Sequence, residues 1–538
     1  MELEVDVELA EDSAAGLDIS SPTSSPQAKR RRHNGSGDDA DDASGSQPDV
    51  GMWDGQQAPE ESPVGIDQVL AWPEYIRRCI EKKNGMAALR NMMKVGVHIN
   101  TDFSGMGCPE LAVKAMSKPF RDVSMDDEHI LLWRASDCNA RCRKILCAGN
   151  DGPQHVFGDL MGRLSVRRQA KLKSAHRAAE KKYRTLTSDG VPLARAATIV
   201  GEKLRRTVAK VLQGQGFGGM LWCYKHEKMC PACGPPADHP QHRAGYFRIA
   251  VAGTTCITWS SMGTKKGWAG WPTIPFMVWA AEVNAWNPHA IIHECVPLFD
   301  VEFLAEVFPN YVASSIVFSP QLLGIPSMRM RRWTLLTRKD VQTKLPFANS
   351  EFAQFCLRPC SENGHCYLLS EDSEQQERIK LMASKRYLPE HQQDGTSWSM
   401  RQVLPEGLHQ KLVMYERHVW KRDKECKYII NLRQTPMYFK SLTEMMPALM
   451  TNSMLWDMTQ GRLFTARELL HAHGIGSAHH DGHDSDGNDV EASGVELLLD
   501  KEFPFGQFVA IVGNSMHLVS FASVFAYLLC FHTAPSEH

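Results

Sequence analysis

Short apolar runs that stop at a glycine, a small residue or an acid recur through the middle of the chain. Each run has the length of one buried strand, and more polar stretches of helical composition separate most of them. Strands that alternate with helices predict an α/β fold with a largely parallel sheet. The predicted strands are 97–102, 130–135, a third ending near 157, 249–252, 290–296 and 312–318, and the predicted helices open at Pro109 or cover 142–146, 193–212 and 275–283.

The first predicted strand runs into a loop of small residues that contains Phe103, Gly105 and Gly107. Pro109 suits the first turn of a following helix. Small residues let a ligand approach the backbone, and the helix N-terminus offers free N–H groups. The loop is either an ordinary tight turn or part of a cofactor site.

Acids at the ends of the next two strands favour the cofactor site. The second strand ends at Asp137 and Cys138, and the third ends at Asp159. Nucleotide-binding folds hold ribose hydroxyls with an acid in this position. The spacing indicates a cofactor that carries adenosine, without saying which one.

Three further segments place reactive groups at strand ends. Gly253 breaks an apolar strand, and Cys256 follows in the turn, where open α/β folds place their chemistry, although a free Cys is often only a small buried hydrophobe. Glu294 ends another strand and is either a proton donor or the partner of a nearby arginine. Arg329 and Arg331 alternate with Met, so an extended backbone points both guanidiniums to one face, suited to a carbonyl or a phosphate.

Residues 161–248 combine a basic stretch with a group of metal-binding side chains. Lys and Arg are dense from 163 to 184, which indicates either phosphate contacts or a solvated helical hairpin. The second half contains a C-x2-C pair among further Cys and His, which predicts a structural zinc site whose ligand subset stays open, the alternative being a reduced loop. The candidate ligands are Cys223, His226, Cys230, Cys233, His239 and His242.

Composition limits the remaining possibilities. The net charge is −2, so any basic surface is local, and 43% hydrophobic residues in 538 support more than one core. The acidic segment 1–62 is predicted to be a disordered tail, and its run 29–32 is either a nuclear import signal, which we favour, or a solvated charge run. Fifteen Cys without a secretory signal indicate a reducing compartment. The apolar run 508–531 is interpreted as core and not as a membrane span, because polar residues interrupt it.

Taken in order, these segments resemble the motifs of the cytosine-5 DNA methyltransferases. The loop 102–107, the strand ends at 137–138 and 159, the Cys256 loop at 254–263, the glutamate motif at 294–296 and the arginine motif at 328–332 follow that family's order. Segments 447–449 and 462–468 resemble its late motifs, and Asn514 and Ser515 lie in the segment that resembles its last one. The resemblance covers roughly 95–160, 249–338 and 446–538.

The resemblance implies a Rossmann-like S-adenosylmethionine-dependent methyltransferase fold with a second, smaller target-recognition domain. It assigns 63–339 to the catalytic domain, 340–445 to the recognition domain, and 446–538 to late motifs that return to the catalytic domain. Cys256 would attack C6 of a cytosine flipped out of duplex DNA, Glu294 would act at N3, Arg331 would hold O2, and Arg329 would support the loop. The cofactor residues would be Phe103, Gly105, Gly107, Asp137, Cys138, Asp159, Asn514 and Ser515.

Four positions depart from the family's pattern. Thr255 replaces a Pro, Ile257 a Gln, Cys295 an Asn and Ser327 a Gln. The substitutions at Thr255, Ile257 and Cys295 favour a non-catalytic relative that binds DNA or a partner, whereas the retained nucleophile, acid and arginines favour an enzyme. An RNA cytosine methyltransferase is a third reading. The segment 356–366, with its Cys and one His, is a candidate second zinc site; the sequence names no recognised DNA site and no chromatin or protein partner.

Overall fold

The computed structural model describes residues 61–533, except for 126–128, 150–151, 240, 242, 244, 261–262, 371, 390–391, 393–395, 421–426, 435–442 and 477–504. The predicted tail with its basic run, apart from residues 61–62, and the candidate ligand His242 therefore lie outside the described residues.

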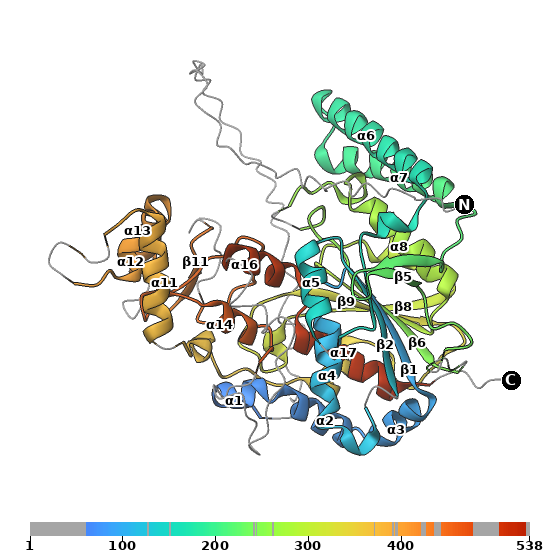
Figure 1. Ribbon diagram of the computed structural model, residues 1–538, viewed down its shortest axis with the longest axis horizontal. Helices are drawn as coiled ribbons and strands as arrows, with labels where there is room; N and C mark the ends of the chain where they lie inside the picture. Colours follow the sequence, from blue (N-terminus) through green and yellow to red (C-terminus); the bar gives the residue numbers. More distant parts are fainter. Residues whose placement is uncertain are drawn as a thin grey trace, which may run out of the picture. The chain divides into compact units, whose positions relative to one another are not determined.

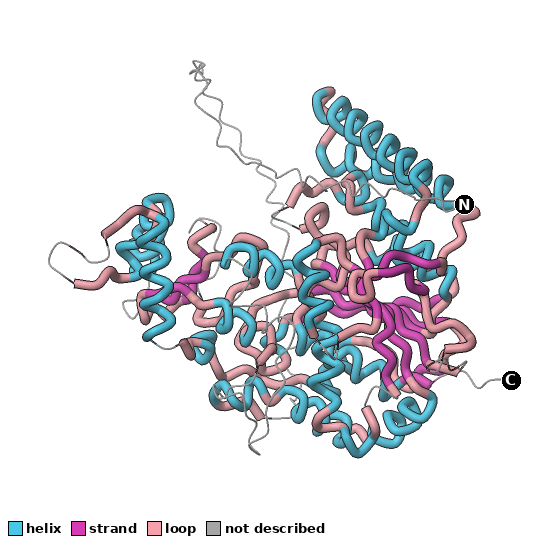
Figure 2. Tube along the Cα trace, in the orientation of Figure 1, coloured by secondary structure: helices cyan, strands magenta, loops and turns pink. Residues whose placement is uncertain are grey.

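Seven strands form one mixed sheet, drawn in magenta in Figure 2. Its order is β3-β2-β1-β6-β7-β9-β8, and every strand runs parallel to the others except β9, which is antiparallel to both of its neighbours. The sheet confirms the predicted Rossmann-like α/β class. The strands are β1 (Val97–Asp102), β2 (Ile130–Ser136), β3 (His155–Phe157), β6 (Phe247–Gly253), β7 (Ala290–Cys295), β8 (Tyr311–Phe318) and β9 (Arg331–Arg338).

All six predicted strands are confirmed, and β9 was missed because two arginines open it. The order of the sheet reverses at β1, which pairs with β2 on one side and with β6 on the other. The chain therefore leaves β1 and β6 in opposite directions, and their carboxyl ends form a switch point, where open α/β sheets bind their ligands.

Alternate residues of the strands face two different cores. Ile249 and Val251 of β6 pack in the core that contains α4 (Cys108–Ser117) and α17 (Leu518–Phe531). Ala250 and Ala252 face the core that contains α7 (Leu193–Leu212) and α8 (Thr273–Trp286). Side chains alternate across a strand, so the sheet is covered on both faces, which explains why its strands are continuous apolar runs.

The apolar C-terminal run forms two helices, α16 (Phe505–Asn514) and α17. By length and composition the stretch Phe505–Phe531 is apolar enough to cross a membrane, but 89% of its most apolar window is buried inside the protein. Every residue of α17 is buried, and the helix packs against α4, α3 (Met86–Val95) and α2 (Trp72–Lys82) (Figure 1). The run is therefore a core element of this fold.

The stretch between β3 and β6 forms a helical hairpin and a β-hairpin. Helix α6 (Val166–Ser188) packs on α7, whose bounds match the prediction, and β4 (Met220–Cys223) pairs with β5 (Lys228–Pro231). A Cβ at Gly201 of α7 would lie 2.8 Å from the Trp268 side chain, so the glycine lets α7 lie directly on η4 (Gly267–Ala269), just after the Cys256 loop.

A smaller hydrophobic core lies in the C-terminal half, between α11 (Asp372–Lys385), α12 (Met400–Val403), α13 (Glu406–Trp420) and the sheet of β11 (Ile429–Asn431), β12 (Leu455–Asp457) and β13 (Arg462–Leu463). It overlaps the predicted recognition domain, whose role stays a prediction.

The remaining elements are α1 (Gly65–Leu70), η2 (Arg121–Val123), α5 (Ala140–Ala148), η3 (Leu160–Arg163), α9 (Val301–Val307), η5 (Pro320–Leu322), β10 (Gln342–Thr343), α10 (Asn349–Cys356), η6 (Gly364–Tyr367), α14 (Ala466–His471) and β14 (His532–Thr533).

Candidate active site and metal centre

The loop after β1 is held in a backbone form that suits few residues. Phe103 has φ 55°, Gly105 has φ 59° and Gly107 has φ 87°. A phenylalanine in the left-handed region is strained, and such strain clusters at ligand-binding sites. Gly107 caps the N-terminus of α4, and Pro109 occupies its first turn, as predicted.

Two distant segments close over this loop. The Gly105 N–H donates to the Asp137 carboxylate at 2.9 Å, and the Met106 N–H donates to Ser515 Oγ at 3.2 Å. A Cβ on Gly105 would lie 2.8 Å from Ser515 Oγ, so only glycine fits beside this late segment. The structure therefore brings together the predicted loop and the predicted last motif, although about 400 residues separate them. Asn514 is exposed at the end of α16.

The predicted adenosine-binding acids lie at neighbouring strand ends. Burial raises the pKa of Asp137, and the nearby Asp159 also raises it, against the backbone N–H groups of Asn139 and Gly105. Asp159 is exposed and accepts a hydrogen bond from the Met161 N–H. Cys138 is exposed as well. The acids thus converge on one edge of the sheet beside the glycine loop, as the prediction requires.

Cys256 stands half-buried in the turn that follows β6. Its carbonyl oxygen accepts hydrogen bonds from the N–H groups of Trp259 and Ser260, both at 2.9 Å, so the turn is tightly closed. Glu294 ends β7 next to it, and its carboxylate pairs with Arg331 Nε at 2.9 Å. The sequence allowed Glu294 to be either a proton donor or the partner of a nearby arginine, and the structure contains the ion pair with Arg331. Arg331 keeps 17% of its side chain exposed, so the pair stands at the rim of the site.

Arg329 lies behind this pair and is fully enclosed. Its guanidinium donates to the carbonyl oxygens of Leu449 at 3.0 Å, Gly513 at 3.3 Å and Ser515 at 2.6 Å. Burial, together with Arg331, lowers the pKa of Arg329 to about 9. The groups that oppose this shift electrostatically are Glu294, Cys256 and Cys108.

The alternation of Arg and Met predicted that the guanidiniums of Arg329 and Arg331 converge on one pocket. They do not, because the guanidinium of Arg329 is enclosed by the late segment. Arg329 is a positioning residue that holds the late segment against the catalytic candidates. A Cβ on Gly253 would lie 3.1 Å from the side chain of Met516, which belongs to that segment, and 3.4 Å from the Glu294 carboxylate. The ends of β6 and β7 and the last motif thus meet in one place.

The departures from the family's pattern leave this arrangement intact. Thr255 and Ile257 are exposed, and the loop is closed by the Thr264 N–H, which donates to the Ile257 carbonyl at 2.9 Å. The buried Cys295 thiol donates to the Thr254 carbonyl at 3.7 Å, and burial raises its pKa. Ser327 is buried and bridges to Met446.

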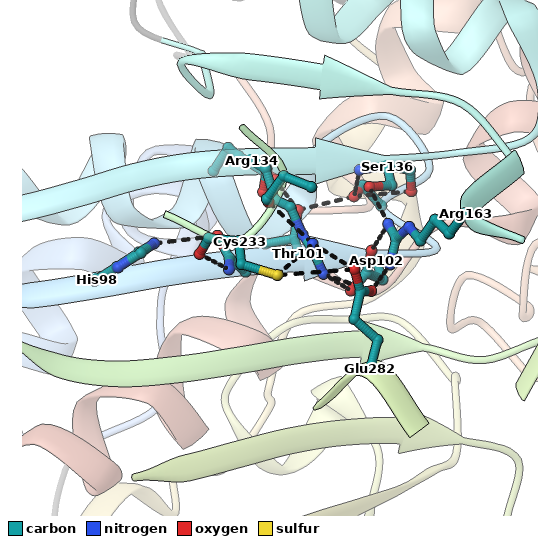
Figure 3. Close-up of polar contacts among 12 residues, drawn as sticks. His98, Thr101, Asp102, Arg134, Ser136, Arg163, Cys233 and Glu282 are labelled. Atoms are coloured by element: carbon teal, nitrogen blue, oxygen red, sulfur yellow. Dashed lines mark hydrogen bonds and ion pairs between the residues drawn. The ribbon is translucent and has the colours of Figure 1, made fainter. Parts of the chain in front are cut away.

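A buried group of four charges beneath the loop was not predicted (Figure 3). Arg134 on β2 and Arg163 in η3 both bind Asp102, at 3.0 and 2.6 Å, and both bind Glu282 of α8. Burial lowers the pKa of Arg163 to about 10. Arg163 was counted in the basic stretch, which was interpreted as either phosphate contacts or a solvated hairpin. Neither interpretation holds for this residue, because both of its ion pairs lie inside the protein. An Arg in the middle of an apolar strand was the available signal, since such a charge needs buried partners.

The structure brings together three of the six candidate metal ligands. Cys223, His226 and Cys230 form one group with His155, and their donor atoms all lie within 4.8 Å of one another. His155 was missed because it precedes the segment by 68 residues and lies in β3, although a histidine in a buried strand was a visible signal. Burial lowers the pKa of His155 to about 4, so its ring is neutral near pH 7.

Of the other candidates, the two that lie among the described residues, Cys233 and His239, do not join this group. The Cys233 thiol faces the buried charges, 3.9 Å from both Arg134 and Glu282, and the His239 ring packs edge-on against Trp133. The segment 356–366 does not form a comparable group among the described residues, because His365 pairs with Asp457. The half-buried Cys360 thiol donates to a backbone carbonyl.

Comparison with known proteins yields structural likenesses only. No protein-family model matches the chain, and no curated protein does. The chain is similar to the Dnmt2 methyltransferase of S. pombe, with 12% identity over 80% of this chain and 98% of that one and a TM-score of 0.37. It is also similar to the Entamoeba histolytica methyltransferase EhMeth, with 13% identity, the same coverage and a TM-score of 0.38.

A Spodoptera frugiperda DNMT2 mutant gives 12% identity over 80% of this chain and 99% of that one, with a TM-score of 0.36. Scores this low carry no argument, so what the site does follows from its own residues.

Proposed function

We propose that this protein transfers a methyl group from S-adenosylmethionine to C5 of cytosine in DNA. The observation that carries the proposal is the meeting of Cys256, the Glu294–Arg331 pair and the last motif around the buried guanidinium of Arg329. A nucleophile, an acid and a cation in one place suit addition to an electron-poor ring position.

The cofactor loop fits a bound adenosyl group. Gly105 and Gly107 let the loop pack closely against Ser515 and Leu146, which a Cβ would approach to 2.8 and 2.9 Å. Helix α4 begins at this loop, and Asp137 and Asp159 stand at the strand ends beside it. When bound, S-adenosylmethionine supplies an electrophilic methyl group.

The chain's own residues supply the rest of the chemistry. The Cys256 thiolate adds to C6 of the cytosine, so that a C–S bond forms and an electron pair becomes available at C5. Glu294 stabilises the charge that reaches N3 by donating a proton or a hydrogen bond. Arg331, which already orients Glu294, would face O2 of the ring. The electron pair at C5 takes the methyl group, and the bond between that methyl and the sulfonium sulfur breaks to leave S-adenosylhomocysteine. The C5 proton is then lost to a water molecule, its electron pair restores the C5–C6 double bond, and cleavage of the C–S bond returns the thiolate.

A basic surface beside the Cys256 loop supports a nucleic acid as the substrate. Lys266, which follows this loop, pairs with Glu180 of α6 at 2.7 Å, so the helical hairpin and the loop are tied together. Cations on such a face contact phosphates, and their binding weakens as salt rises. The exposed cations of α6 are Arg167, Lys171, Lys173, Arg177, Lys181, Lys182 and Arg184.

The decisive experiment is transfer of labelled methyl from S-adenosylmethionine to unmethylated duplex DNA, hemimethylated duplex DNA and tRNA. We expect incorporation into DNA that falls to background in Cys256→Ala. Cys360→Ala is the matched control, since it removes another half-buried thiol elsewhere. Incorporation that survives in Cys256→Ala would overturn the nucleophile.

The competing readings give distinct results. Preference for tRNA would make the protein an RNA methyltransferase. DNA binding without methyl transfer, and without a covalent adduct on 5-fluorocytosine DNA, would make it a binding module. We also expect nuclear localisation from the basic run 29–32, tested by tagging the full chain and a variant with this run neutralised.

A further inference from the structure

The four side chains His155, Cys223, His226 and Cys230 are arranged as ligands of one ion. His226 Nδ1 lies 3.6 Å from each sulfur and 3.1 Å from His155 Nδ1. A nitrogen of this kind carries at most one proton, so it cannot satisfy three neighbours by hydrogen bonds. A cation between the four atoms satisfies all of them at once.

The distances match tetrahedral coordination. Zinc bonds of about 2.3 Å to sulfur and about 2.05 Å to nitrogen place tetrahedral sulfur and nitrogen ligands about 3.6 Å apart, and two nitrogens about 3.3 Å apart. Two thiolates and two imidazoles are ligands that select zinc over magnesium or calcium. Four protein ligands leave no open position, which is typical of a structural ion and not of a catalytic one.

Burial supports the same conclusion. Cys223, Cys230 and His155 are 0%, 3% and 7% exposed, whereas His226 in the turn is exposed, and both thiols are free of disulfides. Three of the ligands belong to the β4–β5 hairpin and its turn, whereas His155 lies on the edge strand β3. The ion would therefore join the hairpin to the edge of the central sheet.

We propose that these four residues bind a structural zinc ion, and that this ion fixes Tyr224 as a wall of the cofactor site. The second part rests on the proposed function. The Tyr224 N–H donates to the Val156 carbonyl at 2.8 Å. This hydrogen bond ties the hairpin to β3 directly beside two of the ligands, since Tyr224 follows Cys223 and Val156 follows His155. The Tyr224 ring packs on Gly158, the residue before Asp159: a Cβ on Gly158 would lie only 3.1 Å from the ring.

A second contact turns Tyr224 toward the predicted ribose-binding strand end. The Arg143 guanidinium lies 4.2 Å from the centre of the Tyr224 ring and donates to the carbonyls of Asp137, at 3.1 Å, and Cys138, at 2.7 Å. The hairpin thus reaches both acids of the adenosine site, Asp137 through Arg143 and Asp159 through the turn at Gly158. Without the ion, the two sulfurs and two rings would separate and Tyr224 would lose its support.

The first test is the metal content of the purified full-length chain. We expect a single zinc ion per chain, lost in Cys230→Ser and in His155→Gln. The matched controls are Cys233→Ser and His239→Gln, which alter the same residue types in the same segment but should retain zinc. Cobalt substitution should give the visible bands of a tetrahedral site with thiolate ligands.

Two results would overturn the site: no zinc in the wild-type chain purified from zinc-supplemented cells, or retention of zinc by His155→Gln together with its loss from Cys233→Ser. Because a variant that loses its metal can unfold, Tyr224→Ala provides the second measurement. It should keep the zinc and weaken binding of S-adenosylhomocysteine about tenfold by calorimetry, whereas Tyr224→Phe, which keeps the ring, should bind nearly normally.

Unchanged binding in Tyr224→Ala would overturn the positioning role. Failure of the wild-type chain to bind S-adenosylhomocysteine would instead count against the proposed function. Metal content is read independently of cofactor and methyl transfer, so the two failures are distinguishable.

Discussion

The same sheet carries two acid–arginine groups that do opposite things. The group of Asp102, Arg134, Arg163 and Glu282 has side chains at most 3% exposed, and each arginine binds both acids. The Glu294–Arg331 pair keeps 9% and 17% of its side chains exposed. Two cations and two anions compensate each other in the first group, so it has no charge left to offer a substrate.

The difference lies in enclosure and in the number of partners. The buried group joins β1, β2, α8 and η3, and the hairpin adds to it through the Ala232 carbonyl, which accepts from Arg134 at 3.0 Å. It therefore holds the layers of the fold together beneath the cofactor loop. The rim pair has one ion-pair contact and lies beside Cys256, so it can exchange partners with a substrate.

The largest expected effect is on stability, from breaking the buried group. Arg134→Met leaves Asp102 and Glu282 with one cation between them, and removing one partner from a buried ion pair costs about 3–5 kcal/mol. Urea unfolding of the purified chain measures this loss. Arg401→Met is the control, because its pair with Glu416 is 46% and 33% exposed and is worth at most about 1 kcal/mol. Equal shifts in both variants would contradict the structural role.

The rim pair should respond in the opposite way. Glu294→Gln removes a proton donor at the surface of the site, which should lower the rate of methyl transfer by about 10²- to 10⁴-fold. The urea midpoint should change little, because Gln has nearly the same shape. Single-turnover transfer at saturating DNA measures the rate. A rate close to that of wild type would show that Glu294 only orients Arg331.

A smaller effect is expected where the two regions meet, at the cofactor loop. Gly105→Ala places a Cβ 2.8 Å from Ser515 Oγ in a left-handed backbone, which costs about 1–2 kcal/mol, and it should weaken S-adenosylhomocysteine binding. Gly162→Ala is the control, since its Cβ would meet nothing within 4 Å. Adding Ser515→Ala should restore part of the loss, because it relieves the contact but not the backbone strain. No recovery would assign the whole cost to the backbone.

The smallest effect is expected at a third acid–base pair, His365 and Asp457, in which the histidine loses its charge as pH rises. The buried Asp457 carboxylate, which pairs with His365 Nδ1 at 2.5 Å, raises the pKa of His365. Its contribution to stability is therefore complete below the unfolded value of about 6.5 and is lost as pH rises through the higher folded value. His365→Gln should lose more stability at about pH 5.5 than at about pH 9, measured by urea unfolding at both. A pH-independent difference would exclude the charged pair.

Local pattern determined much of this protein. Six of the seven strands of the central sheet, both ends of helix α7 and the glycine loop followed from apolar runs, helix-forming residues and turn chemistry. These depend on neighbours within a few residues, so the sequence displays them directly. Cys256 and Glu294 could be singled out as candidates for the same reason, since each stands near the end of an apolar strand.

Only the tertiary structure decided which distant groups meet. The C-x2-C pair pointed to Cys230 and Cys233 together, but the Cys230 thiol lies with His155, Cys223 and His226, whereas the Cys233 thiol faces the buried charges. Arg329 and Arg331 alternate in sequence, yet the return of the last motif encloses the first and leaves the second at the rim. Spacing along the chain sets where a side chain starts, whereas its partner depends on how strands and helices far apart in sequence are packed together.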